Sequence, residues 1–161
     1  MPSKGLEQPA QASDYTIQPA HEEHRVHAAE VRRRLADRKT TLIDGRPTLQ
    51  YTGEEPGRVY HTGKAHDNNG HIPGAINIMW KDNFNADGTF KSVDELRSMY
   101  AAHNVSHDRK IITYCNEGLH ATPPWFVLTE LLGHDHVQVY DESMAEWAND
   151  SSFPVHNGDQ P

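Results

Sequence analysis

The chain has 161 residues, 35% of them hydrophobic and 24% charged, which suits one domain with a buried core. Its formal net charge of −8 argues against a surface that binds nucleic acid or an anionic membrane. No apolar stretch approaches the roughly 20 residues that cross a bilayer, and the start, MPSKGLEQPAQASDY, contains no apolar core of a secretory signal. The single cysteine cannot form a disulfide within the chain, so an oxidising compartment is not implied and we expect a cytoplasmic protein. The charge and the lack of a long apolar stretch predict no nucleic-acid or membrane partner.

The composition predicts one folded domain over residues 24–150 between two tails. Residues 1–20 are rich in Pro, Gln, Ser and Ala and show no hydrophobic periodicity, so residues 1–23 are predicted to be a flexible tail. Residues 151–161 are predicted to be a loose C-terminal tail.

Four short segments are typical of buried strands, and helical patterns follow or precede each of them. The strands are residues 40–44 (TTLID), 75–78 (AINI), 110–114 (KIITY) and 137–140 (VQVY). The helical patterns cover residues 28–37, 92–100 and 121–133, with a short turn or helix at 142–149. This alternation predicts an α/β fold with a mostly parallel central sheet flanked by helices.

Capping signals indicate where two of the helices begin and end. Ser92 and Glu95 form a capping box signature. Thr122 is predicted as an N-cap with Pro123 at the first helical position, and Gly133 is predicted just past the end of the same helix.

A long polar connection, residues 48–69, follows the first strand, and the sequence does not say whether it folds over a functional site. It ends in GHIPGAINI (70–78). There, Pro73 and Gly74 predict a type II turn, because Pro presets the first central φ and Gly accepts the positive φ of the second.

Cys115 follows the strand IITY and comes just before a helix. N–H groups and the peptide dipoles at a helix start stabilise a thiolate, which predicts a lowered pKa. Gly118 would let the loop curl and turn several N–H groups inward. The carboxyl ends of strands are also where open α/β sheets bind ligands. The alternative is a small buried hydrophobic residue that ends the strand.

Six segments, in this order and spacing, resemble the rhodanese family of sulfurtransferases. They are LIDGR (42–46), GHIPGAINI (70–78), GTFKS (88–92), IITYC (111–115), ELLGH (130–134) and YDESMAEWAN (140–149). The similarity covers about residues 25–150 and is closest to the catalytic domain of tandem thiosulfate and 3-mercaptopyruvate sulfurtransferases. The combination of GHIPGA with a cysteine that closes the next core strand is its most specific part.

The resemblance implies a rhodanese-like three-layer fold and a rhodanese-type sulfurtransferase in which Cys115 is catalytic. In that family the cysteine takes a sulfane sulfur from thiosulfate, 3-mercaptopyruvate or a persulfide, and a thiophilic acceptor such as cyanide or a thiol removes it. No cofactor or metal is implied. The alternatives are a sulfur-carrier or regulatory module fed by a protein partner, and a non-catalytic binding domain. A protein sulfur acceptor is a further candidate partner.

The predicted active-site loop consists of Cys115, Asn116, Glu117, Gly118, Leu119 and His120. Its six residues fit the sulfurtransferases, whereas the related phosphatases have a longer loop that ends in arginine, and Ala121 follows here. Asn116 and Glu117 stand where thiosulfate users commonly carry basic residues and mercaptopyruvate users carry hydroxylated ones. A carboxylate beside the thiolate would raise its pKa and repel an anionic donor, so the donor stays unassigned.

Four further side chains are candidates for supporting roles. His120 either supplies a cation to the thiolate or points to solvent. Asp44 and Arg46 match the family's Asp-x-Arg and predict a local ion pair, with Arg46 facing the active site as the alternative. His71 is predicted to hold a turn rather than to act as an acid or base.

Twelve histidines raise the question of a metal site. The two spaced sets are His21, His24 and His27, and the pair His134 and His136. Neither resembles a closed zinc site with cysteine ligands, so no metal site is predicted. The large aromatic residues predicted to pack in the core rather than to bind substrate are Trp80, Trp125 and Trp147.

Overall fold

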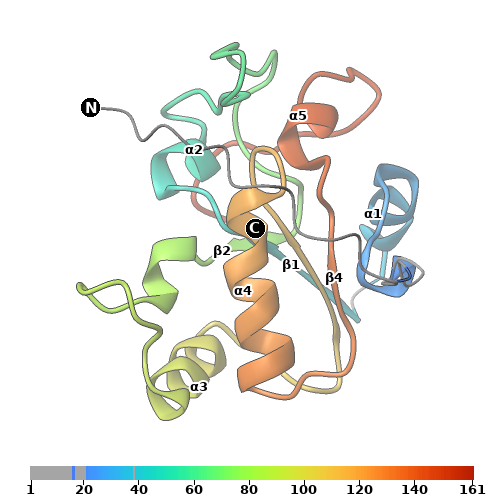
Figure 1. The fold of residues 1–161 in the computed structure, drawn as a ribbon. Helices are drawn as coiled ribbons and strands as arrows, with labels where there is room; N and C mark the ends of the chain where they lie inside the picture. Colours follow the sequence, from blue (N-terminus) through green and yellow to red (C-terminus); the bar gives the residue numbers. More distant parts are fainter. Residues whose placement is uncertain (1–15, 17–20, 38) are drawn as a thin grey trace.

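A single sheet of four parallel strands organises the chain, whose computed structural model describes residues 16, 21–37 and 39–161 (Figure 1). The tail predicted over residues 1–23 lies almost entirely outside the described residues. The sheet has the order β2-β1-β3-β4, with β1 at Thr40–Asp44, β2 at Ala75–Asn77, β3 at Lys110–Tyr114 and β4 at Val137–Val139. The predicted parallel α/β fold is confirmed.

Both faces of this sheet are buried, and neighbouring residues of each strand serve opposite faces. Leu42 and Ile112 belong to one hydrophobic cluster, whereas Ile43 and Ile111 belong to the other. Leu42 pairs with Ile112 in the register of β1 and β3, so like faces align across the two central strands. This is the continuous apolar pattern expected of a parallel strand that is covered on two sides.

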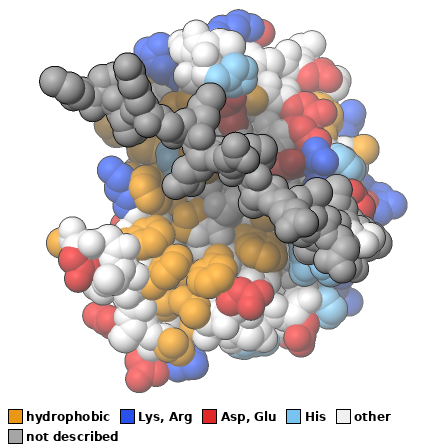
Figure 2. All heavy atoms as spheres, viewed as in Figure 1, with side chains coloured by type: hydrophobic (Ala, Val, Ile, Leu, Met, Phe, Trp, Pro, Cys, Tyr) orange, Lys and Arg blue, Asp and Glu red, His pale blue; other side chains and the backbone are white. Residues whose placement is uncertain are grey.

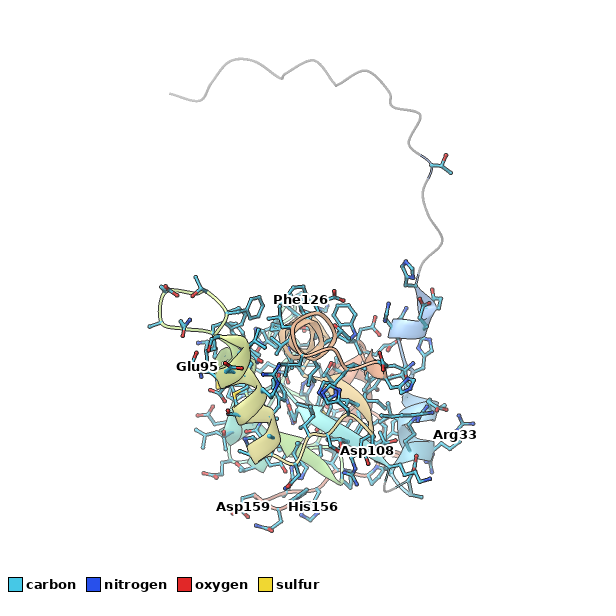
Figure 3. All side chains as sticks on the ribbon, turned by 90° about the horizontal axis from the view of Figure 1, so that it is seen from below. Arg33, Glu95, Asp108, Phe126, His156 and Asp159 are labelled. Atoms are coloured by element: carbon cyan, nitrogen blue, oxygen red, sulfur yellow. The ribbon has the colours of Figure 1, made fainter. Side chains whose placement is uncertain are left out.

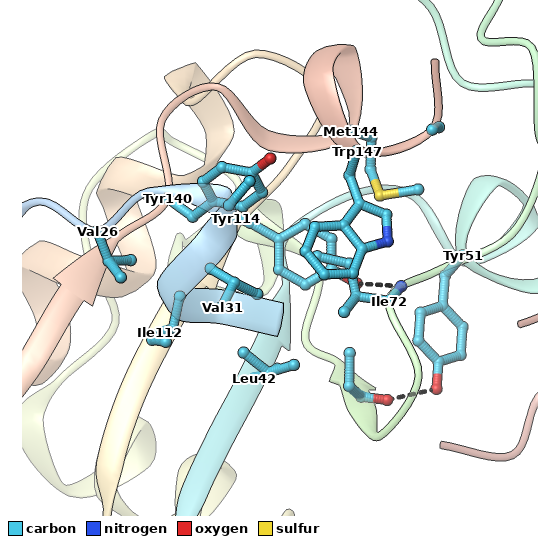
Figure 4. Close-up of a cluster of buried hydrophobic side chains, with 13 residues drawn as sticks. Val26, Val31, Leu42, Tyr51, Ile72, Ile112, Tyr114, Tyr140, Met144 and Trp147 are labelled. Carbon is cyan, nitrogen blue, oxygen red and sulfur yellow. Dashed lines mark hydrogen bonds between the residues drawn. The ribbon is translucent and has the colours of Figure 1, made fainter. Parts of the chain in front are cut away.

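Helices on the two faces complete three layers. Helices α1 (Ala28–Arg34) and α5 (Ser143–Trp147) contribute to the first cluster, which contains Trp147 and is drawn in Figure 4. Helices α3 (Val93–Ala102) and α4 (Thr122–Phe126) contribute to the second. Figure 3, seen from below, shows Phe126 on α4 and Glu95 on α3 above the sheet.

Several short helical turns connect these elements. Helix α2 (Thr48–Thr52) lies in the polar connection where no helix was expected. The 3-10 turns are Glu22–His24, Trp80–Asn83 and Leu119–Ala121, and a π-helical turn, Val127–Leu131, continues α4. None of the helices among the described residues is long and apolar enough to cross a bilayer.

The capping predictions hold at α3 and partly at α4. The capping box of Ser92 and Glu95 forms as predicted. Thr122 is not an N-cap, because the 3-10 turn begins the helix three residues earlier and the Thr122 hydroxyl donates to the Leu119 carbonyl. Gly133 has a φ of 73°, as a residue past a helix end often does.

Residues 153–156 pack against the core, whereas the sequence predicts a loose tail over residues 151–161. Phe153 stacks on Trp147 with ring centroids 4.5 Å apart, and the Trp147 indole donates to the Pro154 carbonyl at 2.7 Å. His156 exchanges two backbone hydrogen bonds with His71. Aromatic burial and these backbone bonds order a segment whose polar composition gave no such signal.

Candidate active site

Cys115 lies at the carboxyl end of β3, in the middle of the sheet, and is fully buried. The backbone N–H groups of Glu117, His120 and Ala121 lie near enough to its thiol to act on its pKa, and that of Ala121 also donates to the Gly118 carbonyl at 3.0 Å. They belong to the loop and the 3-10 turn, not to the first turn of α4. The loop therefore places backbone donors beside one sulfur atom, which is an arrangement that stabilises a negative charge.

Gly118 gives the loop its curl. Its φ is 82°, and a Cβ added there would lie 2.8 Å from the Asp141 carbonyl oxygen. The left-handed backbone and the close approach both require glycine, which agrees with the role predicted for this residue.

The predicted lowering of the thiol pKa is wrong for the resting site. Burial raises the pKa of Cys115 above its ordinary value, although the N–H groups of Glu117, His120 and Ala121 act to lower it. The desolvation of a fully buried sulfur outweighs three amide donors. At neutral pH Cys115 is therefore mainly a thiol.

Ser143, at the start of α5, supports the loop from beneath and was not singled out in the sequence. Its hydroxyl accepts hydrogen bonds from the N–H groups of Cys115 at 3.0 Å and Gly118 at 3.1 Å, and donates to the Tyr140 carbonyl at 2.7 Å. Ser143 is fully buried and has a φ of 54°, which is uncommon outside glycine. Ser143, whose hydroxyl makes three hydrogen bonds, therefore fixes the loop backbone at Cys115 and at Gly118.

The Asn116 side chain is bound by the polar connection, not by a substrate site. Its Oδ1 accepts from His66 Nε2 at 3.0 Å, and its Nδ2 donates to Gln50 at 2.8 Å and to the Tyr60 hydroxyl at 3.3 Å. Burial lowers the pKa of His66, which fits a neutral ring. The connection that the sequence left open therefore lies against the cysteine loop.

The Glu117 carboxylate turns toward the same segment. Oε1 lies 2.6 Å from Nδ1 of His61, and Oε2 accepts from the Tyr60 N–H. The structure thus assigns protein partners to both oxygens of the carboxylate that was expected to repel an anionic donor.

His120 sits among aromatic rings. It stacks on Trp80 with centroids 4.6 Å apart and meets the edge of Tyr60 at 5.5 Å. Burial, together with the positive charge of Lys81, lowers the pKa of His120. These contacts favour a neutral ring over the imidazolium that was one of its two predicted roles, and Trp80 contacts the loop itself.

Asp44 and Arg46 form the predicted ion pair, buried beneath the loop. Nη2 of Arg46 lies 2.6 Å from Oδ2 of Asp44 and also donates to the Gly70 carbonyl at 2.7 Å. Burial acts to lower the pKa of Arg46, but Asp44, and to a smaller extent Tyr114 and Cys115, raise it overall. The guanidinium is thus held by Asp44 and the Gly70 carbonyl, which agrees with the local ion pair expected from the sequence.

Comparison with known proteins identifies this arrangement. Residues 27–150 match the family model described as a rhodanese-like domain. The chain belongs to the rhodanese family. The match covers the sheet, the cysteine loop and the Asp44–Arg46 pair, so the resemblance stated from the sequence is confirmed.

Relatives of this rhodanese-like domain are about twice its length. A protein of Haloferax volcanii, provisionally named a thiosulfate sulfurtransferase, is 39% identical over 90% of this chain and 50% of its own. The sulfur carrier protein TtuD of Thermus thermophilus is 38% identical over 79% of this chain and 45% of its own. The chain therefore spans about half the length of these curated relatives.

Solved structures with the same fold include several of EanB. A variant of EanB in complex with ergothioneine superposes with a TM-score of 0.77 at 27% identity, covering 87% of this chain and 33% of that one. Another EanB structure, with a TM-score of 0.76 at 26% identity and the same coverage, contains a cysteine persulfide in a tetrahedral intermediate state with ergothioneine.

Two remaining histidine predictions concern positions outside the loop. His71 is fully buried, donates from Nδ1 to the Tyr51 carbonyl at 2.8 Å and stacks on the Tyr51 ring, which agrees with a turn-holding role. Among the described residues, one group places possible metal-ligand atoms within 4.8 Å of one another, namely His21, Glu23 and His24. All three are exposed, and the group does not include Cys115.

Proposed function

We propose that this rhodanese-like domain is a sulfurtransferase in which Cys115 carries the transferred sulfur as a persulfide. The observation that carries the proposal is the position of the one cysteine, buried at the carboxyl end of β3 and followed by a tight loop whose N–H groups act on its thiol. Backbone donors aimed at one atom stabilise charge on that atom without reorganising. A persulfide sulfur is anionic at neutral pH, so it suits a site lined by backbone donors.

The reaction is a double displacement. The Cys115 sulfur, after losing its proton, attacks the outer sulfur of thiosulfate; the S–S bond of thiosulfate breaks, and sulfite leaves with the electron pair. An acceptor such as cyanide then attacks the outer sulfur of the persulfide. The Cys115–sulfur bond breaks, the thiolate is regenerated, and thiocyanate leaves. Atoms and charge balance in each half-reaction without a cofactor.

Steady-state turnover tests this proposal. Thiosulfate and cyanide together should give thiocyanate and sulfite with ping-pong kinetics, and Cys115→Ser should remove the activity. Because Cys115 is the only cysteine, no other thiol can replace it. Thiocyanate formation that persists in Cys115→Ser would sink the proposed mechanism.

A sulfur carrier fed by a protein is the second candidate, favoured by the apolar surface beside the loop. Leu119, within the loop, is 68% exposed, and Tyr60 and Phe126 are also exposed. Figure 2 shows hydrophobic side chains gathered over α4 and the segment after β2. A persulfide-loaded protein would fit such a face. Loading of Cys115 by a protein persulfide but not by thiosulfate would favour this candidate.

A further inference from the structure

Residues 57–66 fold into a small hairpin that covers one side of the cysteine loop, and we call them the cover hairpin. The Val59 N–H donates to the Lys64 carbonyl at 2.9 Å, and the His66 N–H donates to the Gly57 carbonyl at 2.9 Å. A Cβ on Gly57 would lie 2.7 Å from Oδ1 of Asn116, so the hairpin approaches the loop closely. The hairpin therefore has its own hydrogen bonds and a fixed position against Asn116.

The cover hairpin binds the Glu117 carboxylate at two points. A carboxylate only accepts hydrogen bonds, so Nδ1 of His61 carries the proton in its 2.6 Å contact with Oε1. The Tyr60 N–H donates to the other oxygen, Oε2. The His61 side chain is 75% exposed and that of Glu117 only 19%, so the pair lies at the outer edge of the loop.

The groups around the Cys115 sulfur are consistent with a Glu117 carboxylate that is turned toward the cover hairpin. Burial raises the pKa of Cys115, and the Asp44 carboxylate, which is paired with Arg46, adds a smaller rise. Three backbone N–H groups of the loop act in the opposite direction. An anionic donor thus meets amide donors as long as Glu117 stays on the hairpin.

We infer that His61 is a specificity-determining residue, which holds the loop's carboxylate on the cover hairpin so that Cys115 accepts an anionic sulfur donor. This inference rests on the proposed function for its biological meaning. Without the His61 donor, the Glu117 carboxylate would turn on its flexible side chain toward the loop's entrance, where it would repel an incoming anion. His61 is a positioning residue, because it acts through Glu117.

Alkylation of Cys115 by two probes of similar size measures this effect without any sulfur transfer. Iodoacetate is anionic and iodoacetamide is neutral, and the single cysteine makes the rate specific for this site. The ratio of the two rates, at one pH and low ionic strength, reports the charge near the sulfur and cancels changes in access. A unit charge at the entrance should change this ratio about threefold to tenfold.

Five variants, four single and one double, give the expected pattern. His61→Ala should lower the iodoacetate-to-iodoacetamide ratio, and His61→Asn, which keeps an N–H near the position of Nδ1, should restore it. Glu117→Gln should raise the ratio, and adding His61→Ala to it should change nothing further. His103→Ala, at the exposed C-cap of α3, is the matched control and should keep the wild-type ratio.

Two results would overturn the inference: an unchanged ratio in His61→Ala, or an equal fall in the Glu117→Gln background. Iodoacetamide rates and circular dichroism show whether each variant is folded, and His61→Asn keeps the test informative if His61→Ala is not. The thiosulfate assay is separate. If thiosulfate never transfers sulfur while the ratios follow the pattern, the proposed donor fails and the positioning role of His61 stands.

Discussion

The two ends of the cysteine loop differ in how their side chains are held. Near Cys115, Asn116 is fully buried, and its amide and the Glu117 carboxylate bond to the cover hairpin. At the far end, Leu119 is 68% exposed and His120 stacks on Trp80. One end is thus held by hydrogen bonds, whereas the other combines an exposed leucine with a histidine ring packed on Trp80 and Tyr60.

What the two ends share is the backbone. N–H groups from both, Glu117 on one side and His120 on the other, lower the pKa of the same thiol. The side chains anchor or expose the loop, while the peptide groups surround the reacting atom. The comparison therefore predicts that changes to the loop's backbone matter most and that changes to its exposed side chain matter least.

The largest expected effect is that of pH on the reactivity of Cys115. Burial raises its pKa, so the thiolate fraction at neutral pH is small and grows tenfold for each pH unit below that pKa. The rate of alkylation by iodoacetamide should rise about a hundredfold between pH 7 and pH 9. An alkylation rate that levels off below pH 7 would mean that the backbone N–H groups lower the pKa of Cys115 by more than burial raises it.

The next effect concerns the curl of the backbone. Gly118→Ala places a Cβ at a φ of 82° and 2.8 Å from the Asp141 carbonyl, and should lower the free energy of unfolding by about 3 kcal/mol. Gly88 has a φ of 84° with no heavy atom within 4 Å of such a Cβ, so Gly88→Ala should lose only about 1 kcal/mol. Urea denaturation of both variants measures the difference. Equal losses would show that the loop has room at Gly118.

Ser143→Ala tests the support beneath the loop. The N–H groups of Cys115 and Gly118 would lose their buried acceptor, and the free energy of unfolding should fall by about 2 kcal/mol. Ser98, whose hydroxyl donates to the Asp94 carbonyl on the exposed side of α3, is the matched control and should lose less than about 0.5 kcal/mol. Similar losses for the two serines would contradict the supporting role.

The smallest effect is expected at the open end of the loop. Because Leu119 is mostly exposed, Leu119→Ala should change the free energy of unfolding by less than about 0.5 kcal/mol, whereas the buried Leu96→Ala should lose about 2–5 kcal/mol. Turnover of thiosulfate should stay within about twofold of wild type. A severe loss of thiosulfate turnover in Leu119→Ala would show that this side chain belongs to the small-molecule site.

Much of the fold follows from local sequence. The strands at residues 40–44 and 110–114 have the predicted bounds, because buried parallel strands are short runs of β-branched and aliphatic residues. The type II turn at Gly74 and the capping box at Ser92 also form from local chemistry. Helix α2 was not predicted because its five residues are too few to show a helical hydrophobic periodicity and it has no side-chain cap.

The site was less predictable than the fold. Cys115 could be found from its place after a core strand, but the partners of its loop come from far away in sequence. Glu117 and His61 are 56 residues apart, and Cys115 and Ser143 are 28 apart. Such contacts depend on how the layers pack, and no local pattern encodes them. For the contact between Cys115 and Ser143, the sequence offered one signal, namely a serine directly after Tyr140-Asp141-Glu142.

Intact-mass measurement of the chain after incubation with thiosulfate tests the central claim most directly. We expect one added sulfur atom, located on Cys115, which cyanide removes and which is absent from Cys115→Ser. The Glu117→Gln variant should also gain the sulfur, because the account assigns the charge-stabilising role to the backbone. Wild-type protein that gains no sulfur from thiosulfate, or gains it at a residue other than Cys115, would contradict the account.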